Sequence, residues 1–124
     1  MGYFLIFLGS GIGGVFRYLL SSTIQRYAIA IGFPFGTFVV NMIGCLIIGF
    51  LAQIGESKGI FSSDVRLFIF VGLLGGFTTF SSFGYETFQL LRDGQYLYAA
   101  ANAILQVVLG VLFVFLGYIL GRLI

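Results

Sequence analysis

The sequence predicts an all-α integral membrane protein, with one domain of residues 1–124 and four transmembrane helices. Two observations point to this fold class: 60% of the residues are hydrophobic and only 8% are charged. A third is the spacing of the charges, which leaves four apolar stretches near the ~20 residues that a helix needs to cross a bilayer. We expect helices at roughly 3–24, 35–54, 66–90 and 97–121, joined by short loops.

Each expected helix has its own signal in the sequence. The first is interrupted by a single charge, Arg17, and the second lies in the uncharged stretch 27–55, with Pro34 where a helix can begin. The third contains the uncharged stretch 67–85, and the fourth lies in the uncharged stretch 94–121. Glycines four residues apart predict close helix contact, although glycine is common in membrane helices generally. The pairs are Gly9 with Gly13 and Gly117 with Gly121.

The third apolar stretch contains a segment that does not suit a continuous helix. Glycine has poor helix propensity, and Ser and Thr side chains offer the backbone alternative hydrogen bonds. We therefore predict a break near Gly75–Thr79. Because a broken helix at membrane depth must be surrounded by protein or a polar cavity, we expect this segment to line a path for a polar solute or ion. The residues concerned are Gly75, Gly76, Thr78, Thr79, Ser81 and Ser82.

The composition argues against an enzyme and against a nucleic-acid-binding protein. The chain has no histidine, and Cys45 is its only cysteine, so Ser–His catalysis, an intrachain disulfide and a cysteine metal cluster are excluded. No span contains paired carboxylates. The net charge is +2 and the basic residues are scattered singly, without the basic patch that nucleic acid requires.

Basic residues are nearly balanced between the two ends of the expected helices, so the bias of Lys and Arg toward cytoplasmic loops gives almost no preferred orientation. Two interpretations stay open: the chain inserts both ways and pairs head-to-tail with itself, or details other than charge select one orientation. One side holds Lys58, Arg66 and Arg122. The other side holds Arg26 and Arg92, and also Arg17 if its side chain reaches that side.

Two amides and two aromatic rings inside the spans are candidate site residues. Asn41 in the second helix and Gln106 in the fourth either donate to an anion or form hydrogen bonds between helices. Phe80 and Phe83 lie among hydroxyl residues and are either packing aromatics or ligands. As ligands they present positive edges to an anion or negative faces to a cation, and the sequence does not choose between these poses.

The break and two charged residues add further candidates. Main-chain oxygens freed at Gly75 and Thr78 suit a hard cation such as Na⁺, and the lack of nearby carboxylates disfavours Ca²⁺ and Mg²⁺. Arg17, expected about one turn from the end of the first helix, either reaches the headgroups or draws anions at a water-filled mouth. Glu86, expected at the end of the third helix, either bonds hydroxyls there or faces water.

Three motifs occur in order along the chain: GGVFRY at 13–18, FGTFVVNMIG at 35–44 and GGFTTFSSF at 75–83. With these motifs, its length and its four spans, the chain resembles the CrcB/Fluc family of fluoride-specific ion channels over essentially its whole length. The third motif is the most specific of the three.

The resemblance implies a dual-topology, antiparallel homodimer with two pores. Such a dimer exports fluoride passively from the bacterial cytoplasm across the plasma (inner) membrane and lowers fluoride toxicity. Its partners are the fluoride ion, the lipid bilayer and a second copy of the chain. The resemblance also implies a structural, non-transported Na⁺ on the backbone carbonyls of Gly75 and Thr78. The implied fluoride pathway comprises Asn41, Phe80, Phe83, Ser81 and Ser82, with Arg17 in the vestibule.

Two other functions remain open beside a fluoride channel. A small dual-topology, proton-coupled multidrug exporter would need a carboxylate inside the membrane; the first helix has none, and Glu86 is expected near a helix end. A non-transporting membrane scaffold would use only the small-residue faces. Weak donors favour the channel, because conduction requires sites that release the ion.

Overall fold

The computed structural model describes all 124 residues and contains only helices. Four helices are long and apolar enough to cross a membrane, which confirms the predicted fold class. Each span begins and ends within four residues of its expected bounds. The four spans are Gly2–Ala28, Phe35–Lys58, Ser63–Arg92 and Tyr96–Arg122.

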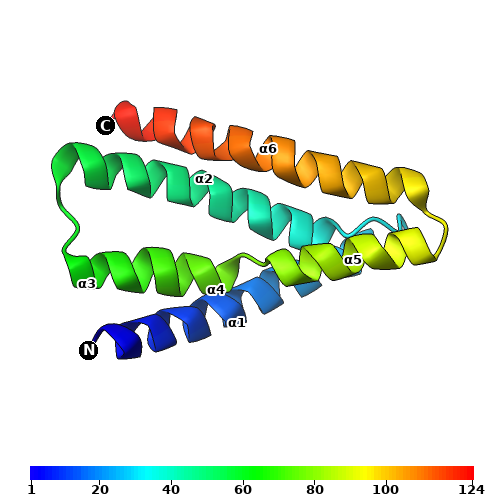
Figure 1. The fold of residues 1–124 in the computed structure, drawn as a ribbon, viewed down its shortest axis with the longest axis horizontal. Coiled ribbons are helices and arrows are strands. Elements are labelled where there is room, and N and C mark those ends of the chain that lie inside the picture. The colour runs from blue at the N-terminus through cyan, green and yellow to red at the C-terminus, as the bar shows by residue number, and fades with distance from the viewer.

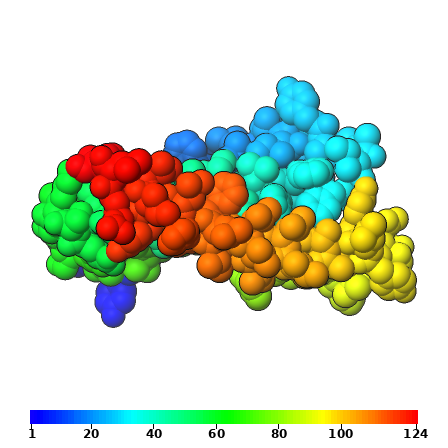
Figure 2. Space-filling view, turned by 90° about the horizontal axis from the view of Figure 1, so that it is seen from above, coloured from blue at the N-terminus to red at the C-terminus, as the bar shows by residue number.

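The spans lie side by side, with both termini at the same end of the molecule (Figure 1). Helix α2 (Phe35–Lys58) packs most extensively against α6 (Tyr96–Arg122), and α1 (Gly2–Ala28) packs against the first half of the third span. The second half of the third span packs on α6 instead. In Figure 2, α6 runs along the visible face of an elongated molecule, so one side of this helix is at the surface.

The third span consists of four pieces. Helix α3 (Ser63–Arg66) leads into a π-helical segment, η1 (Leu67–Leu74), which the sequence did not reveal. Helices α4 (Gly75–Phe77) and α5 (Phe80–Arg92) follow. The span begins three residues earlier than expected because the hydroxyl oxygen of Ser62 caps α3 by accepting from the Val65 N–H at 3.3 Å.

The predicted break lies between α4 and α5. Thr78 and Thr79 have extended backbone angles, with φ/ψ of −90°/160° and −149°/123°. The glycine pair, however, is helical, so its poor helix propensity is not the cause of the break. A Cβ on Gly76 would lie 2.5 Å from the carbonyl oxygen of Ser10, which shows that this glycine permits close packing on α1.

The glycine pairs of the first and last helices are packing positions, as predicted. A Cβ on Gly9 would lie 2.6 Å from the Phe68 carbonyl oxygen, and one on Gly13 would overlap the carbonyl oxygen of Leu73. Gly117 of α6 is equally close to the backbone of Leu46 in α2. Direct backbone contact of this kind holds membrane helices together where lipid provides no hydrophobic drive for association.

Candidate functional site

The side chain of Asn41 bridges the break in the third span. The Thr79 N–H donates to Asn41 Oδ1 at 2.9 Å, and Asn41 Nδ2 donates to the Thr79 carbonyl oxygen at 3.1 Å. A side-chain amide has one donor end and one acceptor end, so it can replace both halves of a peptide hydrogen bond. Asn41 therefore forms hydrogen bonds between α2 and the third span, as one of the two interpretations predicted.

Backbone carbonyls at the break lose their usual donors, and those of Gly75 and Thr78 are among them. In a continuous α-helix, the Gly75 carbonyl would accept from the Thr79 N–H, and the Thr78 carbonyl from the Ser82 N–H. Both donors are turned elsewhere: Thr79 N–H donates to Asn41 Oδ1, and Ser82 N–H to Thr79 Oγ1 at 3.2 Å. Gly75 and Thr78 therefore offer carbonyl oxygens without those helical partners, a donor set that suits a hard monovalent cation.

A cluster of hydroxyls forms the start of α5. Thr79 is its N-cap, and the Thr79 hydroxyl donates to Ser82 Oγ at 3.2 Å and lies 3.4 Å from Ser81 Oγ. The N-terminus of a helix carries partial positive charge and unpaired N–H groups. Because α5 begins in the middle of the third span, this positive end is placed within the apolar part of the molecule, where it favours an anion.

Most of the candidate residues line one cavity of about 370 Å³ between α2, the break and α6. The cavity therefore brings together an amide donor, aromatic rings, hydroxyls and the two carbonyl-bearing residues, although these are far apart in the sequence. The candidate residues that line it are Asn41, Gly75, Thr78, Phe80, Phe83 and Gln106, and Thr79 also lines it. Ser81 and Ser82 are not among the lining residues; they adjoin the cavity through Thr79.

The two phenylalanines lie close together but are exposed to different degrees. Their ring centroids are 5.5 Å apart and the ring planes are inclined by 59°. Phe80 is 81% exposed, whereas Phe83 is half-buried. The Phe80 ring therefore lies at the edge of the cavity and is left uncovered by its own chain.

Asn102 and Thr87, which sequence reasoning missed, extend the hydrogen bonds of Asn41 and Gln106 into a chain. Asn41 Nδ2 donates to Gln106 Oε1 at 2.8 Å, and Gln106 Nε2 donates to Asn102 Oδ1 at 3.2 Å. Asn102 Nδ2 then donates to Thr87 Oγ1 at 2.9 Å. Asn102 is completely buried. The available signal was the spacing of Asn102 and Gln106, which places two amides on one face of the fourth helix.

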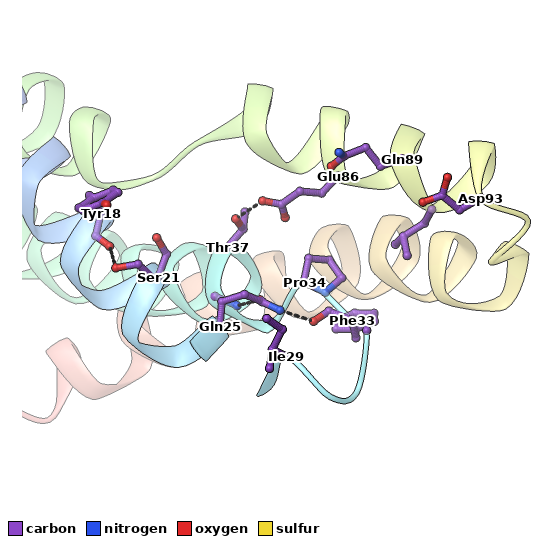
Figure 3. Close-up of a pocket in the computed structure, with 14 residues that line it drawn as sticks. Tyr18, Ser21, Gln25, Ile29, Phe33, Pro34, Thr37, Glu86, Gln89 and Asp93 are labelled. Carbon is purple, nitrogen blue, oxygen red and sulfur yellow. Dashed lines mark hydrogen bonds between the residues drawn. The ribbon is translucent and has the colours of Figure 1, made fainter. Parts of the chain in front are cut away.

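Glu86 belongs to a second cavity, of about 540 Å³, near the other end of α5 (Figure 3). It does not end its helix as expected, because α5 continues for six more residues to Arg92. Its carboxylate accepts from the Thr37 hydroxyl at 2.6 Å, across to α2, rather than from the hydroxyls at the break. Its other carboxylate oxygen is buried without a hydrogen-bond partner.

Arg17 lies farther inside its helix than expected. Since α1 continues to Ala28, Arg17 is eleven residues, about three turns, from the helix end rather than one turn. It is half-buried and makes no salt bridge, and it lines none of the three principal cavities. The structure thus keeps Arg17 apart from the cluster around Asn41.

Comparison with known proteins places the chain in a family. The family model described as "CrcB-like protein, Camphor Resistance (CrcB)" matches residues 4–118. The chain belongs to the CrcB family. Among CrcB relatives, a protein of Methylobacillus flagellatus is 46% identical over 114 residues, covering 92% of this chain and 89% of the relative. One of Parabacteroides distasonis is 46% identical over 119 residues, covering 96% and 91%.

A third CrcB relative, from Phocaeicola vulgatus, is 48% identical over 113 residues, which cover 91% of this chain and 92% of the relative. All three relatives carry the name "Fluoride-specific ion channel FluC". The similarity to them extends over nearly the whole chain, including the break and the residues around it.

Proposed function

We propose that this CrcB-family protein is a passive, fluoride-selective ion channel that lets fluoride leave the cytoplasm and so lowers its toxicity. The observation that carries the proposal is the cavity at the break, where Asn41, Phe80 and Phe83 meet beside the N-terminus of α5. The names of the relatives supply the identity of the anion.

The cavity chemistry suits a small, strongly hydrated anion. Such an ion must exchange its water for donors, and the N-terminus of α5, the amide of Asn41 and the hydroxyls of Ser81 and Ser82 provide them. Ring edges of Phe80 and Phe83 add weak positive potential. None of these groups carries a full charge, so the ion is bound weakly enough to leave, which conduction requires.

We further propose that the working unit is an antiparallel homodimer with dual topology. Phe80 is 81% exposed in the single chain although it lies in the middle of a membrane span, and a second copy would cover it. The balance of basic residues between the two ends of the spans supports insertion in both orientations. We place this dimer in the bacterial plasma (inner) membrane.

We propose a structural Na⁺ at the centre of the dimer, held by the carbonyl oxygens of Gly75 and Thr78. The support is the loss of the helical donors of both carbonyls, since oxygens without partners at membrane depth are costly unless a cation or donor satisfies them. The ion would neutralise these oxygens and fix the two breaks against each other. It would not be transported.

The two rival functions have less support. In a proton-coupled exporter, an embedded carboxylate must exchange protons, yet Glu86 is tied to Thr37 and lines a different cavity from Asn41. A pure scaffold would not need a cavity at the break into which amide, hydroxyl and backbone polar groups are brought together. The relatives described above are named as ion channels.

The direct test is fluoride efflux from liposomes that contain the purified protein, read with a fluoride electrode. We expect efflux only when a potassium ionophore compensates the charge, no chloride efflux under the same conditions, and no dependence on a proton gradient. A correctly folded protein that leaks no fluoride would refute the channel. Efflux that follows the proton gradient would favour the exporter.

A further inference from the structure

The hydrogen bonds around Gln106 form a chain in which every donor points the same way. The chain runs from Asn41 through Gln106 and Asn102 to Thr87. The Thr87 hydroxyl closes it by donating to the Phe83 carbonyl oxygen at 2.8 Å. It therefore connects α2, α6 and α5 around the cavity described above.

This direction presents the wrong end of Gln106 to an anion. Gln106 Oε1, which is partly negative, lies 2.8 Å from Asn41 Nδ2 and uses one of its two hydrogens. The other hydrogen is used by the Thr79 carbonyl oxygen. Asn41 thus has no free donor for an anion until Gln106 Oε1 moves away, because its amide has only two hydrogens.

We propose that Asn102 and Thr87 are positioning residues that allow the Gln106 amide to turn over and present its NH₂ group to fluoride. The proposal rests on the proposed function and assigns it a specificity determinant. Since the oxygen and nitrogen ends of an amide have nearly the same shape, the turn requires no repacking. It frees one hydrogen of Asn41 and adds one from Gln106, so a repelling oxygen is replaced by two donors.

The rest of the chain must reverse together with Gln106. When Gln106 Oε1 turns toward Asn102, the Asn102 amide must turn to donate to it, and Asn102 Oδ1 then needs a donor. Asn102 is completely buried, so no water can supply one. Thr87 can, because a hydroxyl both donates and accepts and its hydrogen rotates freely.

Reversal gives up two hydrogen bonds within the protein: the bond from Asn41 to Gln106, whose donors then face the anion, and the bond from Thr87 to Phe83. The Thr87 hydroxyl leaves the Phe83 carbonyl, which still accepts the backbone N–H of Thr87 in the α-helix. The Gln106–Asn102 and Asn102–Thr87 bonds are re-formed with donor and acceptor exchanged. The hydroxyl of Thr87, which lines neither cavity, thereby decides which end of Gln106 faces the anion.

The test compares Thr87→Val with Thr87→Ser in the fluoride efflux assay. Valine keeps the shape of threonine without its hydroxyl, whereas serine keeps the hydroxyl. Valine removes two hydrogen bonds from the present direction of the chain and one from the reversed direction, so we expect Thr87→Val to change fluoride efflux about tenfold, the effect of about one hydrogen bond, and Thr87→Ser to stay within about twofold of wild type. Size-exclusion profiles and melting temperatures check that both variants fold and assemble.

A spectroscopic readout covers the case in which Thr87→Val does not fold. In ¹⁵N-labelled wild-type protein, fluoride should shift the side-chain amide signals of Gln106 and Asn102 together, because both amides turn. Signals that fluoride leaves unmoved would overturn the proposal, as would efflux that is the same in the two Thr87 variants. A wild-type protein that passes no fluoride would reject the proposed function instead.

Discussion

Asn41 and Thr79 are joined by two hydrogen bonds, at 2.9 and 3.1 Å, and the first of them gives the Thr79 N–H the acceptor that it loses where the third span leaves the helical conformation. Thr79 is buried, only 9% exposed, so no water or lipid headgroup can take the place of Asn41. The residue that we assign to the fluoride pathway is therefore also the residue that makes the break tolerable.

Replacing Asn41 with leucine should impair both stability and conduction. The Thr79 N–H would be buried without a partner, at about 1–3 kcal/mol, whereas the Thr79 carbonyl would keep the first backbone bond of α5, whose N-cap is Thr79. We expect a lower melting temperature in detergent and no measurable fluoride efflux. The control is Met42→Leu at the adjacent buried position, a volume-conserving change that should cost less than about 1.5 kcal/mol. Equal melting temperatures for the two variants would contradict the bridging role.

Replacing either phenylalanine with isoleucine should suppress conduction while the dimer persists. Isoleucine keeps an apolar side chain but removes the positive ring edge, and the fold of the single chain should lose little stability at Phe80 because its ring is 81% exposed there. We expect a fall in fluoride efflux of at least about tenfold for Phe80→Ile and for Phe83→Ile, if the ring edges contribute about 1.4 kcal/mol.

The matched control for the phenylalanine variants is Phe115→Ile. Phe115 is 60% exposed on α6 and lines none of the three principal cavities. Its replacement should leave efflux at the wild-type rate. A scaffold function predicts instead that cells keep the same fluoride resistance with all three variants.

Replacement by alanine should lower the stability of the protein at one glycine of α1 and leave it unchanged at another. A Cβ at Gly13 would overlap the Leu73 carbonyl and lie 2.9 Å from the Phe77 nitrogen, so Gly13→Ala must push α1 away from η1 and α4. We expect a loss of about 1–3 kcal/mol in the free energy of unfolding. Gly11→Ala meets no atom within 4 Å and should be neutral in the single chain. Thermal unfolding of both variants decides; a stable Gly13→Ala protein would show that the helices are not in contact there.

Removing Na⁺ should loosen the assembly. If the carbonyls of Gly75 and Thr78 hold the ion, then exchange for a bulky organic cation such as N-methyl-D-glucamine leaves four unsatisfied oxygens in a dimer, two from each chain. We expect dissociation to monomers on dilution and loss of fluoride efflux, both restored by added Na⁺. The sodium assignment is wrong if dimer stability and efflux are the same in the two buffers.

Dual topology predicts that a C-terminal reporter is found on both faces of the membrane. Fusions active only in the cytoplasm and fusions active only outside it should both give signal. Because the charge balance is close, adding two lysines after Ile124 should shift the population toward a cytoplasmic C-terminus. Signal from one face alone, unchanged by added charge, would rule out insertion in both orientations.

The sequence by itself determined the fold class, the four spans and the existence of a break. These are properties of local composition: apolar stretches of bilayer length, and hydroxyl residues that compete for backbone hydrogen bonds. The break lies within the predicted 75–79, but the glycine pair does not cause it, because Gly75 and Gly76 stay helical where Gly76 packs directly on Ser10.

Only the tertiary structure decided which polar groups meet. Residues 41, 79, 87, 102 and 106 belong to different segments, and the packing of α2 and α5 on α6 makes them one hydrogen-bonded chain. The same packing separates Glu86 from that chain and gives it Thr37 as its partner. A buried polar atom must find a partner wherever the fold offers one, and that choice depends on three-dimensional distance rather than on spacing along the chain.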